Sequence, residues 1–309
     1  MIARRSALVY LTNAVGAVLG YVGLFLVARF MPNPQEAVGL VAFGLGFVGS
    51  FFVLTNLGIP QAHAKRVSEG QPLDRCLGTF ALLQGVQVAL AVGAVFLAVW
   101  IWTGVLGRGF ETPLHGRVIY VMLLYFLALN LGGIGTSTFD ARLEAARSQA
   151  SNFSGTVVRV GGMALVALAG LGPLELAWAY ALGALASAAA VLLLLRGYPV
   201  GRPDLDLTKS YLRFAFPLAL PATLGGLSIL IDKAVIQLFW GAAEVGYYFV
   251  SQRILQLLAV VTSAVAILLL PSVSSLHARE DVEGLRVKAA QAERYLSMVM
   301  APLAALLVA

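Results

Sequence analysis

Residues 211–239 read YLRFAFPLALPATLGGLSILIDKAVIQLF, and the pair Asp232-Lys233 interrupts an otherwise apolar run. A helix of about 20 apolar residues crosses a bilayer, so this run is long enough to span one. A charge at the bilayer centre costs roughly 2.5–3.5 kcal/mol, and such residues usually face a protein interior or a wet cavity. The run therefore predicts a membrane helix whose charged residues serve the interior of the protein.

The composition of the whole chain is that of a membrane protein with many spans. Hydrophobic residues make up 60% of the sequence and charged residues 12%, whereas soluble domains are about half apolar and a quarter charged. The N-terminus reads Met1-Ile2-Ala3-Arg4-Arg5 and continues apolar to about Phe30 without a small-residue cleavage site, which predicts a retained first span. Cys76 is the only cysteine, so an intrachain disulfide is excluded.

Apolar stretches of about 20 residues predict an all-α polytopic protein with about nine transmembrane helices. The predicted spans are residues 7–30, 36–58, 76–102, 116–138, 153–171, 174–195, 211–239, 245–270 and 289–309. A cytoplasmic N-terminus places most of the 21 lysines and arginines on the inside, as the positive-inside rule requires. We therefore expect a multi-pass protein of the cytoplasmic (inner) membrane with its N-terminus in the cytoplasm. Arg159, near the start of the fifth span, is expected to reach the cytoplasmic interface.

Two hairpins of the chain are similar to each other. The first has the sequence Glu36-Ala37-Val38-Gly39, an apolar span and then Leu57-Gly58-Ile59-Pro60. The second has Glu244-Val245-Gly246, an apolar span and then Leu269-Leu270-Pro271. Six spans separate the two hairpins, so both enter the membrane in the same orientation. This pattern predicts a parallel repeat of six helices, related by an axis along the membrane normal.

The repeat divides the chain into two predicted domains. Residues 1–200 form an N-terminal six-helix transmembrane bundle, and residues 201–309 form the first three helices of an incomplete second bundle. The last predicted span runs into Ala305-Leu306-Leu307-Val308-Ala309 without a polar flank. We therefore expect the chain to be a fragment of a longer protein.

Several short segments share their order and spacing with a known family. They are Ala28-Arg29-Phe30-Met31-Pro32 with Glu36 and Gly39, Leu57-Gly58-Ile59-Pro60, Phe214-Ala215-Phe216-Pro217-Leu218, Asp232-Lys233, Glu244-Val245-Gly246-Tyr247-Tyr248 and Leu270-Pro271-Ser272. In these segments the chain resembles the polysaccharide-transporter branch of the multidrug/oligosaccharidyl-lipid/polysaccharide (MOP) flippase superfamily, which includes O-antigen flippases. The resemblance covers most of the chain. It implies two six-helix bundles around a central cavity that opens alternately to each side of the membrane.

The resemblance implies a lipid-linked oligosaccharide as substrate, that is, a polyprenyl-pyrophosphate glycan. Its pyrophosphate and sugar head are strongly hydrated, so a flippase needs a polar and partly cationic cavity, in which arginine engages phosphate through a bidentate fork. The candidate residues of this cavity are Asp232, Lys233, Arg253, Arg29, Asn130 and Gln252.

These candidates allow other interpretations. Asp232 and Arg253 both lie roughly 12 Å below the outer ends of their helices, so an ion pair could fix helix packing while Lys233 faces the cavity. Asp232 could instead couple transport to protons or sodium. Arg29 could snorkel to the membrane surface. Asn130 and Gln252 could join helices by hydrogen bonds.

Three further functions stay open. A flippase for the peptidoglycan precursor lipid II typically carries arginines in the middle of its first helix, but residues 17–23 hold no cation. A cation-coupled multidrug antiporter often uses a carboxylate buried in the first bundle, and the first six spans contain none at mid-depth. A lipid scramblase or an assembly subunit of a glycan-synthesis complex is the third alternative.

No enzyme signature is found in the sequence. The three histidines lack the cysteine or carboxylate spacing of a metal site, the paired glycines lack the context of a phosphate loop, and no basic region with interleaved aromatics indicates nucleic acid. We therefore predict no catalytic activity, no cofactor, no metal and no nucleic-acid partner. The expected partners are the lipid-linked oligosaccharide, membrane lipids, and a polysaccharide polymerase or glycosyltransferase.

Overall fold

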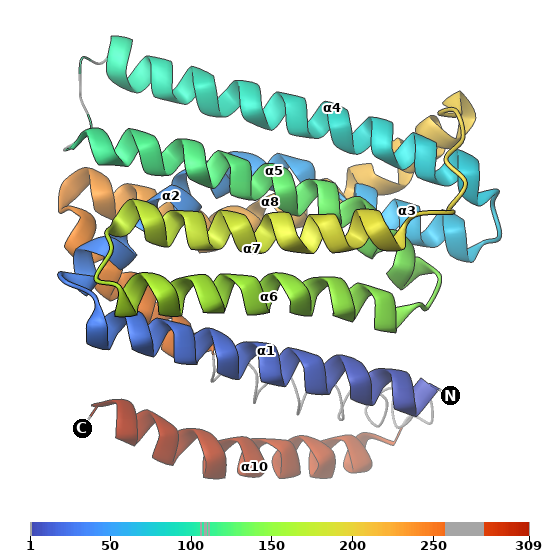
Figure 1. Cartoon of the computed structure of the whole chain (residues 1–309). Helices are drawn as coiled ribbons and strands as arrows, with labels where there is room; N and C mark the ends of the chain where they lie inside the picture. The colour runs from blue at the N-terminus through green and yellow to red at the C-terminus, as the bar shows by residue number, and fades with distance from the viewer. Residues whose placement is uncertain (1, 106, 108–109, 111, 257–280, 309) are drawn as a thin grey trace. The chain divides into compact units, whose positions relative to one another are not determined.

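The computed structural model describes residues 2–105, 107, 110, 112–256 and 281–308 (Figure 1). The ordered elements of this described part are helical, which confirms the predicted all-α fold. The chain divides into two compact units, residues 1–247 and residues 248–309.

The larger unit contains nearly all of the helices. They are α1 (Ile2–Phe30), α2 (Pro34–Phe52), the 3-10 turn η1 (Val53–Thr55), α3 (Ile59–Ser68), α4 (Leu73–Trp100), the π turn η2 (Ile101–Val105), α5 (Pro113–Ala141), α6 (Ala145–Leu168), α7 (Pro173–Leu194) and α8 (Leu205–Phe239). Residues 242–256 are also helical, and the boundary between the units falls within this helix. The smaller unit contains α10 (Val282–Val308).

Among the described residues, six helical segments are long and apolar enough to cross a membrane. They are Val9–Phe30, Pro34–Thr55, Leu73–Val105, Pro113–Ala141, Pro173–Leu194 and Leu205–Phe239. Each corresponds to one predicted span, so a multi-pass membrane protein is confirmed. The predicted spans 153–171 and 289–309 fall on α6 and α10, which are more polar than the six. The predicted span 245–270 lies partly outside the described residues, and the count of nine stays a prediction.

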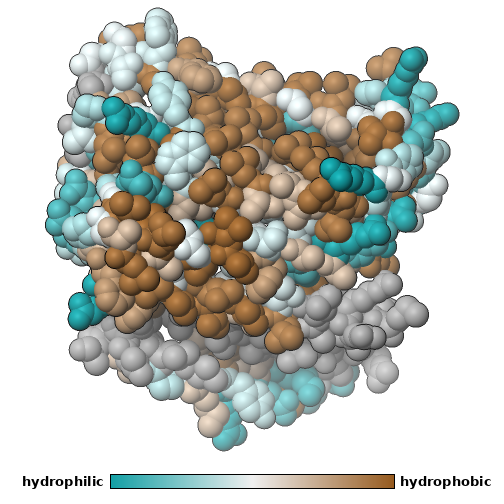
Figure 2. All heavy atoms as spheres, viewed as in Figure 1, coloured by the Kyte–Doolittle hydropathy of each residue, from teal (hydrophilic) through white to brown (hydrophobic). Residues whose placement is uncertain are grey.

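The long helices of the larger unit alternate in direction along the chain, and the short α3 lies at one end of them (Figure 1). Helix α6 packs along α7 and α1, and α7 also packs along α5. Figure 2 shows brown, hydrophobic side chains across the middle of these helices and most teal, hydrophilic ones toward their ends. This distribution is that of a helical bundle with its middle in hydrocarbon.

Small residues allow the close approach of these helices. A Cβ atom added at Gly183 of α7 would lie 2.8 Å from the carbonyl oxygen of Gly155 on α6. On the other side of α7, Ala128 of α5 packs against Ala184 and Ala188. Membrane helices associate through such small residues because lipid leaves them no hydrophobic driving force.

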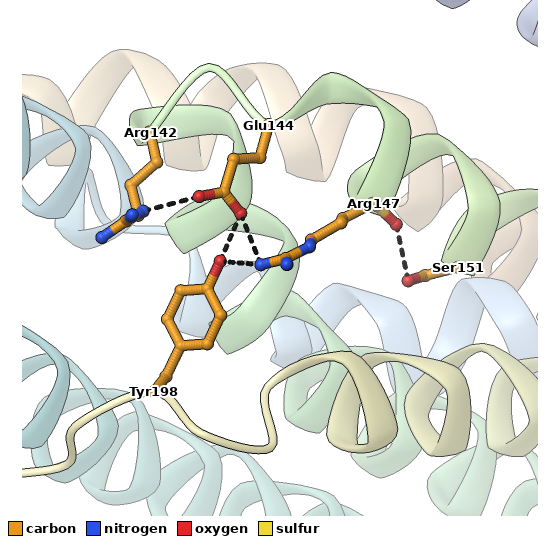
Figure 3. A network of polar contacts seen from close by, with 5 residues as sticks. All are labelled: Arg142, Glu144, Arg147, Ser151 and Tyr198. Atoms are coloured by element: carbon orange, nitrogen blue, oxygen red, sulfur yellow. Dashed lines mark hydrogen bonds and ion pairs between the residues drawn. The ribbon is translucent and has the colours of Figure 1, made fainter.

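A cluster of polar contacts joins the turn between α5 and α6 to the segment after α7 (Figure 3). The Glu144 carboxylate accepts hydrogen bonds from Arg142 Nε at 2.7 Å, Arg147 Nη1 at 2.9 Å and the Tyr198 hydroxyl. Burial acts to raise the pKa of Glu144, but the hydrogen bonds from Tyr198 and Arg142 and the two arginine charges hold this pKa below its usual value. The charged segment at residues 140–152 is thus the end of α5, this turn and the start of α6.

A buried histidine fixes the short helix α3. His63 Nδ1 lies 2.9 Å from the Tyr211 hydroxyl of α8, and Nε2 lies 2.9 Å from Thr138 Oγ1 of α5. The Thr138 hydroxyl donates its hydrogen to the Ile134 carbonyl at 2.8 Å, so the Thr138 oxygen accepts a hydrogen bond from His63 Nε2–H. Because the neutral ring carries its proton on Nε2, His63 Nδ1 accepts a hydrogen bond from the Tyr211 hydroxyl. The His63 ring also stacks on Phe80, with ring centroids 4.3 Å apart.

This burial should make stability depend on pH. Burial lowers the pKa of His63 from 6.5 to about 4. Between these values the unfolded chain binds a proton that the folded chain does not, so the free energy of unfolding falls as the pH drops. We expect a loss of about 3 kcal/mol from pH 6.5 to pH 4. Thermal unfolding of the purified wild type and of His63→Gln, measured between pH 6.5 and pH 4, checks this prediction. If the stability of the two proteins depended equally on pH, the prediction would be contradicted.

Candidate functional site

Three cations line a pocket between α3 and the start of α8, which we call the basic pocket. It has a volume of about 500 Å³ and is lined by Arg66 of α3 and by Lys209, Ser210, Arg213 and Phe214 of α8. Lys209 and Arg213 are four residues apart, so they lie on one face of the helix. The basic pocket therefore presents positive charge from two elements that are far apart in the sequence.

One carboxylate, that of Glu69, lies beside these cations. Arg66 Nη1 is 2.6 Å from Glu69 Oε2, and Lys65 Nζ is 3.9 Å from Glu69 Oε1. Arg66 Nε is buried and has no hydrogen-bond partner among the described residues. Lys65 Nζ also lies 4.5 Å from the ring centroid of Phe214. Glu69 is the carboxylate that forms ion pairs with these cations among the described residues, and four cations exceed its one charge, so the site suits a ligand that carries several negative charges.

The sequence at the start of α3 sets the position of Arg66. Gly58 has φ +83°, and a Cβ there would lie 3.0 Å from the Ala215 carbonyl oxygen. Glycine adopts this left-handed conformation without strain and lets α3 approach α8 closely. Ile59 and Ala62 then join Tyr211 and Ala215 in a buried apolar cluster. This cluster and the His63 hydrogen bonds hold Arg66 over the start of α8.

A second, mostly apolar cavity lies further along α8, and we call it the aromatic cavity. Its volume is about 570 Å³. Its aromatic side chains come from α2, from η2, from the segment before α5 and from the start of α5: Phe43, Phe47, Phe51, Trp102, Phe110 and His115. Residues 227–238 of α8 complete the wall. At 1.5 Å per residue they lie roughly 20 Å along the helix from Arg213, so the two cavities are separate.

Lys233 is buried between α2 and α8, with 2% of its surface exposed. Its Nζ donates to the Ile229 carbonyl at 2.6 Å. A Cβ at Gly46 of α2 would lie 2.7 Å from Lys233 Cβ, so the lysine stem packs directly on α2. Asp232, the next residue, is half-buried and does not line either cavity. Lys233 thus lies at the seam between the two helices that line the aromatic cavity.

Arg253 and Gln252 belong to the smaller unit. Arg253 Nη1 donates to Gln256 Oε1 at 3.0 Å, and its guanidinium carbon lies 4.9 Å from the ring centroid of Phe249. Asp232 lies in the larger unit, so the predicted pair between Asp232 and Arg253 stays a prediction.

The two other predicted residues lie outside the basic pocket and the aromatic cavity. Arg29 is exposed at the end of α1, with its guanidinium carbon 5.9 Å from the ring centroid of Phe30. Asn130 Oδ1 accepts from Gln84 Nε2 at 2.8 Å, and Gln84 Nε2 also donates to the Thr55 carbonyl. Asn130 and Gln84 therefore join α5, α4 and η1, which is the helix-joining role left open for Asn130.

The comparisons with known proteins agree with this fold. A solved structure described as the inward-facing conformation of a multidrug resistance MATE family transporter of the MOP superfamily matches 94% of this chain and 69% of that chain. The TM-score is 0.70 at 18% sequence identity, so the likeness concerns the fold. The chain thus shares the fold of this membrane transporter.

The sequence itself gives the family. A family model described as "polysaccharide biosynthesis protein" matches residues 26–309, and the chain belongs to this family. Among curated proteins, no match is found. The resemblance to the MOP superfamily in the sequence is thus confirmed.

Proposed function

We propose that this protein moves a lipid-linked oligosaccharide across the cytoplasmic membrane by alternating access. The observation that carries the proposal is the basic pocket, in which Arg66, Lys209 and Arg213 converge from two helices. A polyprenyl-pyrophosphate glycan carries two linked phosphates, and arginine binds phosphate with paired, charge-assisted hydrogen bonds. Membership of the polysaccharide biosynthesis family supports a glycan as the cargo.

The orientation of the chain is part of this proposal. With the N-terminus in the cytoplasm, α3 and the start of α8 lie on the cytoplasmic side, where lipid-linked glycans are assembled. The basic pocket then captures the pyrophosphate before it crosses. The aromatic cavity lies toward the outer side, and its aromatic rings can pack on the apolar faces of sugar rings. A polysaccharide polymerase or glycosyltransferase would supply or receive the glycan.

The division into two bundles, residues 1–200 and 201–309, also belongs to the proposal. A Cβ at Gly39 would lie 1.6 Å from the Ala242 carbonyl oxygen, and a Cβ at Gly246 would lie 2.0 Å from the Gln35 carbonyl oxygen. Gly39 and Gly246 are equivalent positions of the two similar hairpins, and equivalent positions meet where a two-fold axis passes. This reciprocal contact supports a parallel repeat, as in many transporters.

The six residues predicted from the sequence keep different roles in this scheme. Lys233 and Asp232 stay candidates for the translocation route because α8 lines both cavities. Arg253 and Gln252 stay candidates on the helix at residues 242–256. Arg29 and Asn130 are assigned to the membrane surface and to helix packing.

Complementation tests the proposal in cells. The full-length protein is expressed in a strain that accumulates a lipid-linked glycan on the cytoplasmic side, and surface polysaccharide is measured. We expect surface polysaccharide to be restored and the internal lipid-linked pool to fall. Resistance to toxic organic cations without restored polysaccharide would contradict the proposal and favour a multidrug transporter.

A further inference from the structure

A polar groove lies between α1 and α6, away from the basic pocket and the aromatic cavity. It has a volume of about 250 Å³ and is lined by polar side chains of the two helices: Thr12, Asn13, Gln149, Asn152, Thr156 and Arg159. A smaller cavity of about 180 Å³, lined also by residues of α5 and α7, shares Asn152, Thr156 and Arg159. We call the two together the α1–α6 groove.

The polar residues of α6 lie on one face of the helix. Positions 149, 152, 156 and 159 are separated by three, four and three residues, which is the spacing of a single helical stripe. On the facing helix α1, a Cβ added at Gly16 would meet no atom within 4 Å. The groove is therefore open at Gly16, with polar groups along its α6 side.

Arg159 lies at the middle of the membrane-spanning part. A Cβ at Gly183 would lie 2.6 Å from Arg159 Cβ, and the Arg159 guanidinium carbon is 5.6 Å from the ring centroid of Tyr180. Gly183 and Tyr180 are central in the candidate span Pro173–Leu194. The expectation that Arg159 reaches the cytoplasmic interface is therefore wrong, because α6 begins at Ala145, well before the predicted span.

This cation has no acidic partner in the part of the chain that the structure describes. None of the ion pairs formed there involves Arg159. The groove around it offers the neutral amides of Asn13, Gln149 and Asn152, which can donate N–H groups. A charge at mid-depth is costly unless it is paired or hydrated, and it usually marks a substrate or ion path.

We propose that the α1–α6 groove is a second binding site of this protein and that it accepts a phosphate group. Arg159 holds two phosphate oxygens through its guanidinium fork, and the amide of Asn152, two turns away on the same face of α6, donates to a remaining oxygen. The Thr156 hydroxyl donates to the Asn152 carbonyl at 3.0 Å, so its oxygen does not supply a proton to the ligand. The phosphate belongs either to a polyprenyl carrier that enters from the lipid or to a free anion. The site does not depend on the identity of the transported glycan.

Binding measurements on the full chain in uncharged phosphatidylcholine nanodiscs test this site. Undecaprenyl phosphate and inorganic pyrophosphate are titrated as separate probes by calorimetry. The protein carries Arg66→Gln, Lys209→Gln and Arg213→Gln, so that the basic pocket does not contribute. We expect Arg159→Gln to weaken binding of at least one probe about tenfold or more, and Arg159→Lys to weaken it less. Weaker binding of undecaprenyl phosphate alone identifies a polyprenyl carrier as the ligand. Weaker binding of pyrophosphate identifies a free anion.

Two further variants keep the test decisive. Arg196→Gln removes one exposed positive charge at the end of α7 and should leave both affinities unchanged. Gly16→Leu fills the groove from α1 without altering Arg159, and it should weaken binding even if Arg159→Gln folds poorly. Unchanged affinity in a folded Arg159→Gln or Gly16→Leu protein would overturn the proposal. The binding measurements test this site, and transport of a glycan tests the proposed function. Failure of the site and failure of the proposed function are therefore distinguishable.

Discussion

Gly39→Val is expected to abolish transport and to lower the thermal stability of the protein. A Cβ at position 39 would lie 1.6 Å from the Ala242 carbonyl oxygen and 3.0 Å from the Gly246 amide nitrogen. Both neighbours are backbone atoms, so no side chain can rotate away, and the helices themselves must separate. Overpacking of this kind costs about 1–3 kcal/mol and occasionally more, and the overlap here places it at the upper end.

The reason for an effect on transport as well as on stability is the place of the contact. Gly39 is in the second turn of α2, and in the proposed orientation this is the outer end of the helix. Alternating access requires that the outer ends close while the cytoplasmic side is open. A valine at position 39 prevents this closure.

Gly85→Val is a matched control, because Gly85 is also within a span and a Cβ there would meet no atom within 4 Å. Both variants are compared with the wild type by surface polysaccharide in the complemented strain and by thermal unfolding of the purified protein. Gly85→Val should behave as the wild type. If Gly39→Val also did so, the close packing of α2 against residues 242–246 would be wrong.

Neutralising the basic pocket should give the second large effect. The triple variant Arg66→Gln, Lys209→Gln and Arg213→Gln removes three of the four cations around the pocket and leaves Glu69 in place. Hydrogen bonds to charged groups contribute about 1.5–3 kcal/mol each, so we expect the rate at low substrate concentration to fall at least about tenfold. Added salt, which screens exposed charges, should slow the wild type more than the variant.

The control for this variant has the same change in charge elsewhere. Arg196→Gln, Arg202→Gln and Lys288→Gln together remove three exposed positive charges that do not line the basic pocket. Initial transport rates of both proteins are measured over a range of substrate concentrations. An equal decrease in both would show that net charge, and not the basic pocket, determines the rate.

Much of the fold could be predicted from the sequence because hydropathy and helix length report directly on the bilayer. Six of the nine predicted spans each match a candidate span among the described residues. Helix α6, like α10, is not among these candidate spans. The polar stripe of α6 from Gln149 to Arg159 lowers its hydropathy, and α6 starts at Ala145, eight residues before the predicted start at residue 153. The same stripe that obscures the span forms the α1–α6 groove.

The binding sites could be predicted only in part, because they depend on contacts between distant segments. Arg66 and Lys209 are among the lysines and arginines that the predicted orientation places in the cytoplasm, and the four-residue spacing of Lys209 and Arg213 is a local signal of a shared helix face. Their approach to each other depends on the turn at Gly58 and on the hydrogen bond between His63 and Tyr211. The pair Asp232-Lys233 lies on α8, the helix that lines both cavities, and its role in transport stays a prediction.

Reconstitution tests the central claim most directly. The full-length protein is placed in liposomes with a fluorescently labelled polyprenyl-pyrophosphate oligosaccharide, and a membrane-impermeant reagent that destroys the label measures the fraction in the outer leaflet over time. We predict that the protected fraction exchanges between leaflets much faster than in protein-free liposomes and that the basic-pocket variant slows this exchange. Exchange no faster than in protein-free liposomes, from correctly folded protein, would contradict the account.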